Sequence, residues 1–434
     1  MKEIQLTSGN QGHILTNTGV WSRDSRWLVY DIRVRDDVFS GTRIERVNIG
    51  SKEVKLLYQT GKDACCGVVT CSPVEDKAVF IHGPENPTND WQYSAFHRKG
   101  MVLDMNHPAK RVIADARNLT KPFTPGALRG GTHVHVFSGD GQWISFTYED
   151  ALLAENKIER NGRHINLRNV GVCVPNGPVK VNKAHPRNHD GEYFSVLVSK
   201  TSAKPKPGSD EISRAFSDAW VGNDGYVKTD GTHRKKAIAF QGHVCTTRGE
   251  IISEVFIADL PDDMTRAAPG LPLEGTVNTR PNPPAGVVQR RLTYTADRRY
   301  PGLQGPRHWL RSSPDGSKIA FLMKDDDGTV QLWTVSPEGG EPQQISSNPW
   351  DIQSAFSWSP DGKTIAHVMD NSIFVTGTAT GRSRRITERT ADINAPTSHS
   401  CVFSPDGKMI AYMRPDPTGG DGRCQLYTVN SHAP

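Results

Sequence analysis

The sequence predicts an all-β fold, a single seven-bladed β-propeller that spans residues 1–434 and is closed by its own N-terminal strand. A tight-turn motif, Ser-Pro-Asp-Gly, recurs between short runs in which apolar and polar residues alternate. Two further strand-like runs follow each such pair, so a repeat contains four strands, as one propeller blade does. The last repeat lacks its fourth strand, and the first residues of the chain have the character of that strand.

The clearest repeats lie at the C-terminal end, with turns at Ser313–Gly316, Ser359–Gly362 and Ser404–Gly407. In each turn the proline presets φ, the aspartate can hydrogen-bond the backbone ahead, and the glycine takes the positive φ that other residues avoid. The motif is therefore structural and carries no information about activity.

Degenerate copies of this turn bring the number of predicted blades to seven. They lie at Trp21–Ser25, Cys71–Glu75, Phe137–Gly141 and Arg187–Gly191. We expect Lys2–Thr7 to complete the blade that ends at Gln425–Val429, because closing the ring removes two exposed sheet edges. Two separate propellers or sandwiches are the alternative arrangement.

Three stretches interrupt the regular spacing and are predicted to be insertions, near residues 151–181, 201–236 and 261–282. The second contains a segment that reads as a helix, Asp210–Trp220, with Asp210 as its N-cap. Insertions into a repeat fold often form loops on a binding face, and inert surface loops are the alternative.

The composition excludes several classes of protein. No apolar run approaches the roughly 20 residues that a membrane span needs, and a formal charge of +5 over 434 residues is too dilute to indicate nucleic-acid binding. Met1–Gly9 lacks the basic and apolar regions of a secretory signal, so the chain as written is expected to be cytoplasmic, or periplasmic or secreted if a signal was removed. Seven scattered cysteines indicate a reducing compartment rather than a disulfide framework.

Aligning the turns predicts a site at one mouth of the central channel. The innermost strand of each blade lines the channel, so equivalent positions near its start form a ring. Four residues before the aromatic position of each turn, this ring comprises Asn17, Gly67, His133, Lys183, His308, Ser354 and His399. Two residues further along, on the same side of an alternating strand, it comprises Gly19, Val69, His135, His185, Leu310, Phe356 and Cys401. A structural role for each histidine is the alternative.

The stretch Leu128–Gly141, which contains Arg-Gly-Gly-Thr-His-Val-His, and the following Ser145–Glu149 resemble an uncharacterised family of bacterial propellers related to propeller ulvan lyases. The blade pattern resembles TolB-type propellers and oligogalacturonate lyases. This resemblance implies a lyase that cleaves a uronic-acid-containing polysaccharide or oligosaccharide, ulvan- or pectate-like, by β-elimination. A non-catalytic TolB-like propeller that binds a protein or a glycan is the alternative.

Under this resemblance a base removes the proton beside a neutralised carboxylate and an acid protonates the leaving oxygen. The residues predicted to be catalytic are His133 or His135 as the base, with Tyr193 and Arg187. The residues predicted to bind the substrate are Arg129, Asn17, Lys183, His185, Arg307, His308 and His399. Tyr148 is an alternative proton donor. The chain departs from the lyases at Leu152 and Leu153, where a second histidine is expected.

Two metal sites are also considered. His243 and Cys245 lie two residues apart on a predicted strand, and the resemblance to ulvan lyases implies a structural zinc that Cys173 could complete. A buried cysteine beside a surface histidine is the alternative. The oligogalacturonate lyases imply a divalent metal at the channel mouth, although Pro396 stands where their glutamine is expected.

Overall fold

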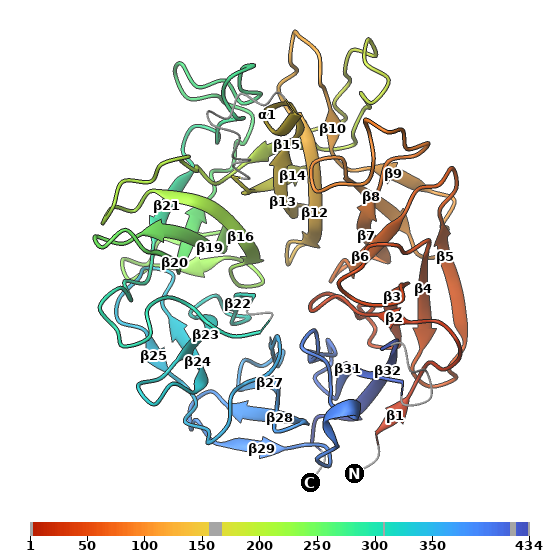
Figure 1. Cartoon of the computed structure of the whole chain (residues 1–434), viewed down its shortest axis with the longest axis vertical. Helices are drawn as coiled ribbons and strands as arrows, with labels where there is room; N and C mark the ends of the chain where they lie inside the picture. The colour runs from red at the N-terminus through yellow and green to blue at the C-terminus, as the bar shows by residue number, and fades with distance from the viewer. Residues whose placement is uncertain (1–2, 156–166, 307–308, 417–421, 433–434) are drawn as a thin grey trace.

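The computed structural model describes residues 3–155, 167–306, 309–416 and 422–432. Within these residues seven four-stranded antiparallel sheets surround a central opening, and both chain ends lie at the same side of the ring (Figure 1). The predicted seven-bladed propeller is therefore confirmed. Among the described helices, none is long and apolar enough to cross a membrane.

The blades follow one another along the chain, and the first six each run from the innermost to the outermost strand. Blades one and two comprise β2 (His13–Ile14), β3 (Trp27–Ile32), β4 (Arg43–Asn48) and β5 (Val54–Gln59), then β6 (Cys66–Cys71), β7 (Lys77–His82), β8 (Lys99–Asp104) and β9 (Arg111–Ile113). Blades three and four comprise β12 (Gly130–Phe137), β13 (Ile144–Asp150), β14 (Asn169–Val174) and β15 (Phe194–Leu197), then β16 (Ile212–Trp220), β19 (Ala237–Cys245), β20 (Ile251–Asp259) and β21 (Val288–Arg291).

The remaining blades are more regular. Blades five and six comprise β22 (Arg311–Ser312), β23 (Ile319–Lys324), β24 (Val330–Val335) and β25 (Gln343–Gln344), then β26 (Ser357–Trp358), β27 (Thr364–Met369), β28 (Ser372–Gly377) and β29 (Ser383–Arg385). Blade seven comprises β30 (Val402–Phe403), β31 (Met409–Pro415), β32 (Cys424–Asn430) and β1 (Ile4–Gln5). The additional elements are β10 (Ala116–Arg117), β11 (Ala127–Leu128), β17 (Tyr226–Val227), β18 (His233–Arg234), α1 (Ala151–Glu155) and a 3₁₀ turn at Asp392–Asn394.

The core lies between neighbouring blades rather than in one central cluster. Val79 and Val102 of blade two, for example, pack with Phe146 and Leu197 of blade three, and all four are buried. Because alternate residues of a strand face opposite sides, each blade buries both faces against its neighbours. All seven cysteines carry free thiols.

The N-terminal strand closes the ring as predicted. Ile4 and Gln5 of β1 pair with Thr428 and Tyr427 of β32, and the Leu6 amide donates to the Leu426 carbonyl at 2.8 Å. The Glu3 carboxylate accepts hydrogen bonds from the Tyr412 hydroxyl and from Arg414. Blade seven is therefore a sheet built from both ends of the chain.

The helix predicted over residues 210–220 is wrong, because Ile212–Trp220 forms β16, the innermost strand of blade four. Its pairing with β19 shifts register twice, and Ser217 has a positive φ of 56°. Each shift adds a residue to the alternation, as β-bulges do, so buried side chains recur about every three residues. That spacing imitates the period of a helix.

This strand also corrects the alignment of the fourth blade. The Trp220 indole donates to the Val136 carbonyl of blade three, just as the Trp21 and Trp358 indoles donate to the blades before them. Trp220 therefore occupies the aromatic position of the fourth turn, which β17 and β18 lengthen. The predicted turn at Arg187–Gly191 lies instead in blade three, between β14 and β15.

Candidate functional site

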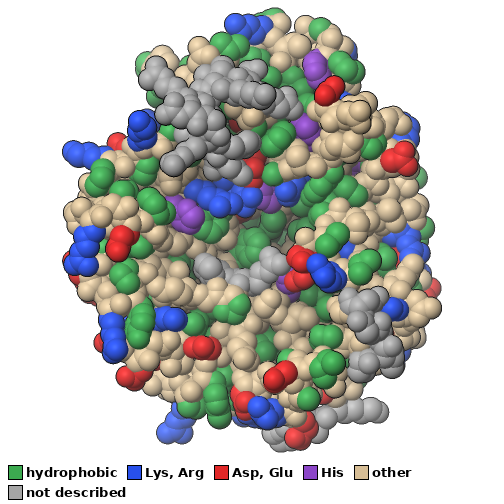
Figure 2. Space-filling view, in the orientation of Figure 1, with side chains coloured by type: hydrophobic (Ala, Val, Ile, Leu, Met, Phe, Trp, Pro, Cys, Tyr) green, Lys and Arg blue, Asp and Glu red, His purple; other side chains and the backbone are tan. Residues whose placement is uncertain are grey.

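The inner strands all begin at one end of the channel, which we call the upper mouth. Its rim is formed by the first residues of the inner strands, by the loops that lead into them and by the loops between the second and third strands. Figure 2 shows Lys and Arg side chains gathered beside the central opening. Three arginines that act on one another electrostatically come from blades two, three and four.

Arg98, Arg168 and Arg214 form this basic cluster. Arg168 donates from Nε at 2.8 Å and from Nη2 at 2.5 Å to Oε1 of Glu149. Burial lowers the pKa of Arg98 and of Arg214, and the Glu149 charge acts on both of them. Among the described residues, the field of one carboxylate thus acts on three guanidinium groups, of which only Arg168 is paired with it. This excess of positive charge favours binding of a further anion.

His133 lies within the field of these arginines. Burial lowers its pKa well below the ordinary value, and the charges of Arg98, Arg168 and Arg214 lower it further. Its imidazole is therefore neutral at pH 7 and can accept a proton. An anion bound among the arginines would offset their charge and make this imidazole a stronger base.

Aromatic rings extend the rim on both sides of the arginine cluster. Tyr93 and Phe39 stack in parallel with their centroids 4.6 Å apart, and the Arg98 guanidinium lies 5.3 Å from the Tyr93 centroid. On the other side, Arg214 lies 5.2 Å from the ring of Phe216. Burial raises the pKa of Tyr93, so its hydroxyl stays protonated at neutral pH. Such rings suit contact with the apolar faces of sugars.

His399 completes the described rim between blades seven and one. Its Nδ1 lies 2.5 Å from Oδ2 of Asp36, and both side chains are only partly exposed. A carboxylate at this position orients an imidazole. The structure thus places His399 at the predicted mouth, as it does His133.

His135 does not share that mouth. Val134 has a positive φ of 55°, and the pairing of β12 with β13 shifts register between His133 and Val136. This bulge reverses the alternation, so His135 points toward blade two and is fully buried, with its Nε2 3.0 Å from the Thr132 hydroxyl. This position does not fit the predicted catalytic role, because the bulge interrupts the alternation on which that prediction rested.

Because His135 is buried, we expect the free energy of unfolding to fall in acid. Burial lowers its pKa from 6.5 to about 3. Between these pH values the unfolded chain binds the proton and the folded chain does not. The contribution of His135 to the free energy of unfolding is therefore complete above pH 6.5 and is lost as the pH falls toward 3. We expect this side chain alone to lower the free energy of unfolding by about 2–3 kcal/mol between pH 7 and about pH 4.5. Urea unfolding of the wild type and of His135→Gln at both pH values measures this loss of stability. An equal pH dependence of the free energy of unfolding in the two proteins would refute the prediction.

Arg129 is also buried, in a network that holds a loop rather than a substrate. Its Nη2 donates to Oδ2 of Asp150 at 2.6 Å and to the Thr279 carbonyl at 2.9 Å. The Tyr148 hydroxyl donates to the same Asp150 oxygen at 2.9 Å. The substrate-binding role predicted for Arg129 and the proton-donor role considered for Tyr148 do not fit this burial.

The site residues predicted in the fourth blade lie instead in blade three, in the segment between β14 and β15. Lys183 pairs with Asp190, Arg187 donates to the Glu85 carbonyl at 2.7 Å, and His185 lies 6.1 Å from Trp91. Tyr193 directly precedes β15, which is the outermost strand. Lys183 and His185 are absent from the ring because the fourth inner strand is β16, where Phe216 and Asp218 take the positions assigned to them.

Asn17 lies inside the channel but binds the protein itself. Its Oδ1 accepts a hydrogen bond from Nη2 of Arg311 at 2.8 Å, which joins blade one to blade five across the lumen. Both side chains are buried. On the other side of this strut, a separate cavity of about 410 Å³ is walled by Trp21, Trp220 and Trp358. Arg307 and His308, also predicted to bind substrate, lie outside the described residues.

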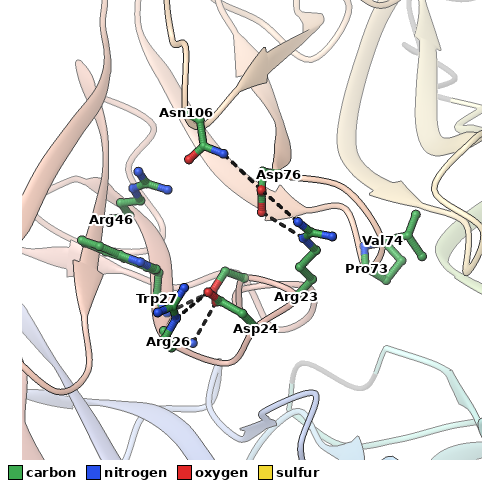
Figure 3. Close-up of a pocket in the computed structure, with 10 residues that line it drawn as sticks. Arg23, Asp24, Arg26, Trp27, Arg46, Pro73, Val74, Asp76 and Asn106 are labelled. Carbon is green, nitrogen blue, oxygen red and sulfur yellow. Dashed lines mark hydrogen bonds and ion pairs between the residues drawn. The ribbon is translucent and has the colours of Figure 1, made fainter.

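A third hollow, of about 640 Å³, lies at the turns of blades one and two (Figure 3). Two of its three arginines are paired, since Arg23 contacts Asp76 at 3.2 Å and Arg26 contacts Asp24 at 2.6 Å. The third, Arg46, lies 4.6 Å from the Trp27 ring. The arginine cluster of the upper mouth is less neutralised and more buried. We therefore take the upper mouth as the candidate site.

The predicted zinc site does not form among the described residues, where no group of three or more histidine, cysteine or acidic side chains is placed to hold a metal. His243 instead packs edge-on against Phe216, with centroids 4.9 Å apart. Cys173 packs toward blade two, in the cluster of Val79, and so faces away from Cys245 on β19. At the mouth, three guanidinium groups do not suit a cation, so the described donors do not fit the divalent metal either.

The residues that the sequence analysis missed are Arg98, Arg168, Arg214, Glu149 and Tyr93. Arg98 and Tyr93 lie in the loop between β7 and β8, where no repeat position could indicate them. The sequence could have indicated Arg214. It lies two residues before Phe216, which is the ring position of blade four once that blade is aligned on Trp220.

Comparisons with known proteins agree with this architecture. A family model described as a protein of unknown function, DUF3748, matches residues 65–189, and one described as the dipeptidyl peptidase IV N-terminal region matches residues 327–421. The chain is 48% identical over 412 residues to the "Uncharacterized protein YidR" of Escherichia coli strain K12, covering 94% of each protein.

Solved structures of similar fold include two oligogalacturonate lyases. One, in complex with manganese, has a TM-score of 0.53 at 12% identity, covering 98% of this chain and 92% of that one. The other, from Vibrio parahaemolyticus, has a TM-score of 0.51 at 11% identity with the same coverage. At such identities the likeness shows the fold alone.

Proposed function

The chain belongs to the family of YidR from Escherichia coli, and from its upper mouth we propose that it is a polysaccharide lyase that cleaves a uronic-acid-containing glycan by β-elimination. The observation that carries this proposal is the cluster of Arg98, Arg168 and Arg214 around Glu149. The likeness of the fold to oligogalacturonate lyases supports it.

Elimination needs an acidified proton and a base. The proton beside a uronate carboxylate is only weakly acidic until the carboxylate charge is neutralised, and arginines accomplish this by charge-assisted hydrogen bonds. His133, neutral because of its burial, would take that proton. The electron pair then forms the new carbon–carbon double bond as the bond to the glycosidic oxygen breaks.

The leaving oxygen needs a proton in return. We assign this donation to Tyr93, whose hydroxyl is protonated at neutral pH. Burial raises its pKa and opposes the transfer, whereas the adjacent Arg98 lowers the pKa and would stabilise the phenolate that forms. One proton is thus gained by His133 and one is lost by Tyr93. No step is assigned to a metal, since the described residues do not fit one.

The direct test is ultraviolet absorbance of the unsaturated uronide product, screened over ulvan, pectate, alginate and glycosaminoglycans. A rise in absorbance on one of them supports the lyase. Saturable binding to an acidic glycan without any product would instead favour a non-catalytic glycan-binding propeller at the same mouth.

Arg214→Gln tests the anion site. The Nε of Arg214 is buried and has no hydrogen-bond partner among the described residues, so its loss breaks no described bond of that atom. We expect the affinity for an acidic oligosaccharide to fall by about 10- to 100-fold, because a charge-assisted hydrogen bond contributes about 1.5–3 kcal/mol. Titration calorimetry at low and high salt measures it. Arg23→Gln, in the hollow of Figure 3, is the matched control and should bind as the wild type does.

A further inference from the structure

A hollow of about 460 Å³ lies between blades five and six, on the same face as the upper mouth. Its lining includes Asp327, Trp350, Gln353, Asn371 and Arg389. These residues belong to the loops that enter the inner strands and to the loops between the second and third strands, which meet at this face. Gln353 directly precedes Ser354, a ring position, so the hollow borders the channel mouth.

Trp350 lines this hollow with a large aromatic side chain that is partly open to solvent. The side chain is 48% exposed, yet its loop is fixed on both sides. The Gln331 side chain exchanges two hydrogen bonds with the Asn348 backbone, at 2.8 and 3.0 Å. After the tryptophan, the Asp351 carboxylate accepts from the Val330 amide at 2.7 Å. A large aromatic side chain held rigidly in solvent loses little entropy on binding a ligand.

The walls around Trp350 carry polar groups in fixed positions. The Asn371 side chain donates from Nδ2 to Oδ1 of Asp392 at 2.6 Å. The backbone N–H of Asn371 donates to Oε1 of Gln353 at 3.3 Å. Arg389 is bound through Nε to Asp370 at 2.8 Å but remains 63% exposed. Such donors and acceptors beside an exposed aromatic ring can bind the hydroxyl groups of a sugar while the ring stacks on its apolar face.

The charge of the hollow excludes an acidic sugar. Besides Arg389, its lining contains Asp327, Asp351, Asp370 and Asp392. A uronate placed here would be repelled by this excess of carboxylates. The upper mouth has the opposite charge, so the two sites select different sugar residues.

We propose that the hollow at Trp350 binds a neutral sugar residue of a glycan. If the proposed function of the upper mouth holds, the substrate is a heteropolysaccharide in which neutral sugars adjoin uronates, rather than a polyuronate. The neutral-sugar site itself is testable without that function.

The test is titration calorimetry with two kinds of probe, a panel of neutral hexasaccharides (cellohexaose, xylohexaose and mannohexaose) and tetragalacturonate. We expect Trp350→Ala to weaken binding of a neutral probe by about tenfold or more, and Trp350→Phe to restore most of it. This binding should be insensitive to salt, because no net charge is exchanged. Tyr294→Ala removes another exposed aromatic ring, 67% exposed and outside the hollow, and should leave it unchanged.

The two proposals fail separately. If no neutral probe binds, or if Trp350→Ala binds it as the wild type does, the neutral-sugar site is overturned, and tetragalacturonate binding that is lost in Arg214→Gln would still support the upper mouth. If a neutral probe binds at Trp350 and tetragalacturonate does not bind at all, the upper-mouth proposal fails and the neutral-sugar site stands.

Discussion

Removal of residues 1–7 is expected to destabilise the propeller strongly. The deletion takes away the fourth strand of blade seven, including the buried Leu6 and the Glu3 contacts to Tyr412 and Arg414. It exposes the edge of β32 and leaves the ring joined only by the packing of blade seven on blade one. The loss in free energy of unfolding should be roughly 5 kcal/mol or more, since it combines a lost strand, a lost core side chain and a broken partly buried ion pair.

Urea and thermal unfolding measure this effect, with two point variants for comparison. Leu6→Ala should cost about 2–4 kcal/mol, because Leu6 is 5% exposed and packs with Ile14 and Leu426. Gln5→Ala, at an exposed position of the same strand, should cost less than about 1 kcal/mol. An unchanged unfolding midpoint in the truncated protein would show that closure of the ring at blade seven does not depend on the N-terminal strand.

His133→Ala is expected to lower turnover by about two to four powers of ten on whichever acidic glycan the wild type cleaves, with little change in KM. The reason is that a base contributes in the transition state, whereas Arg98, Arg168 and Arg214 still hold the carboxylate. His135→Ala is the control, two residues away on the same strand but buried toward blade two. It should lower stability and leave the turnover of the folded protein nearly unchanged.

Kinetics of both variants, with their unfolding midpoints, separate the roles. His133→Gln keeps a polar side chain if the alanine variant folds poorly, and it should be as slow. Equal turnover in the wild type and in the His133 variants would show that His133 is not the base. Tyr93→Phe should also slow turnover, because it removes the proposed proton donor and retains the ring that stacks on Phe39.

The parts of the fold that local chemistry dictates could be predicted from the sequence. Proline, aspartate and glycine in the turns at Ser313, Ser359 and Ser404 serve local backbone requirements, so they identified blades five to seven and the missing strand. The ring positions of His133 and His399 followed from the same alignment.

The predictions that do not fit the structure share one physical cause. Pairing between strands overrides the pattern of apolar and polar residues along the chain. Bulges at Val134 and Ser217 leave no mark in the sequence, yet they turn His135 away from the mouth and give β16 the period of a helix. The arginines of the mouth meet only because loops and strands of three blades converge, and no spacing along the chain records that convergence.

The hydrogen bond from Arg311 to Asn17 across the channel bears on how a long glycan could be processed. Both side chains are buried in the lumen, and Arg311 also lines the cavity of the three tryptophans. A polymer threaded through the ring would have to break this hydrogen bond. A polymer that leaves the bond intact lies across the rim or inserts one end, and each product then leaves by the opening through which the substrate entered.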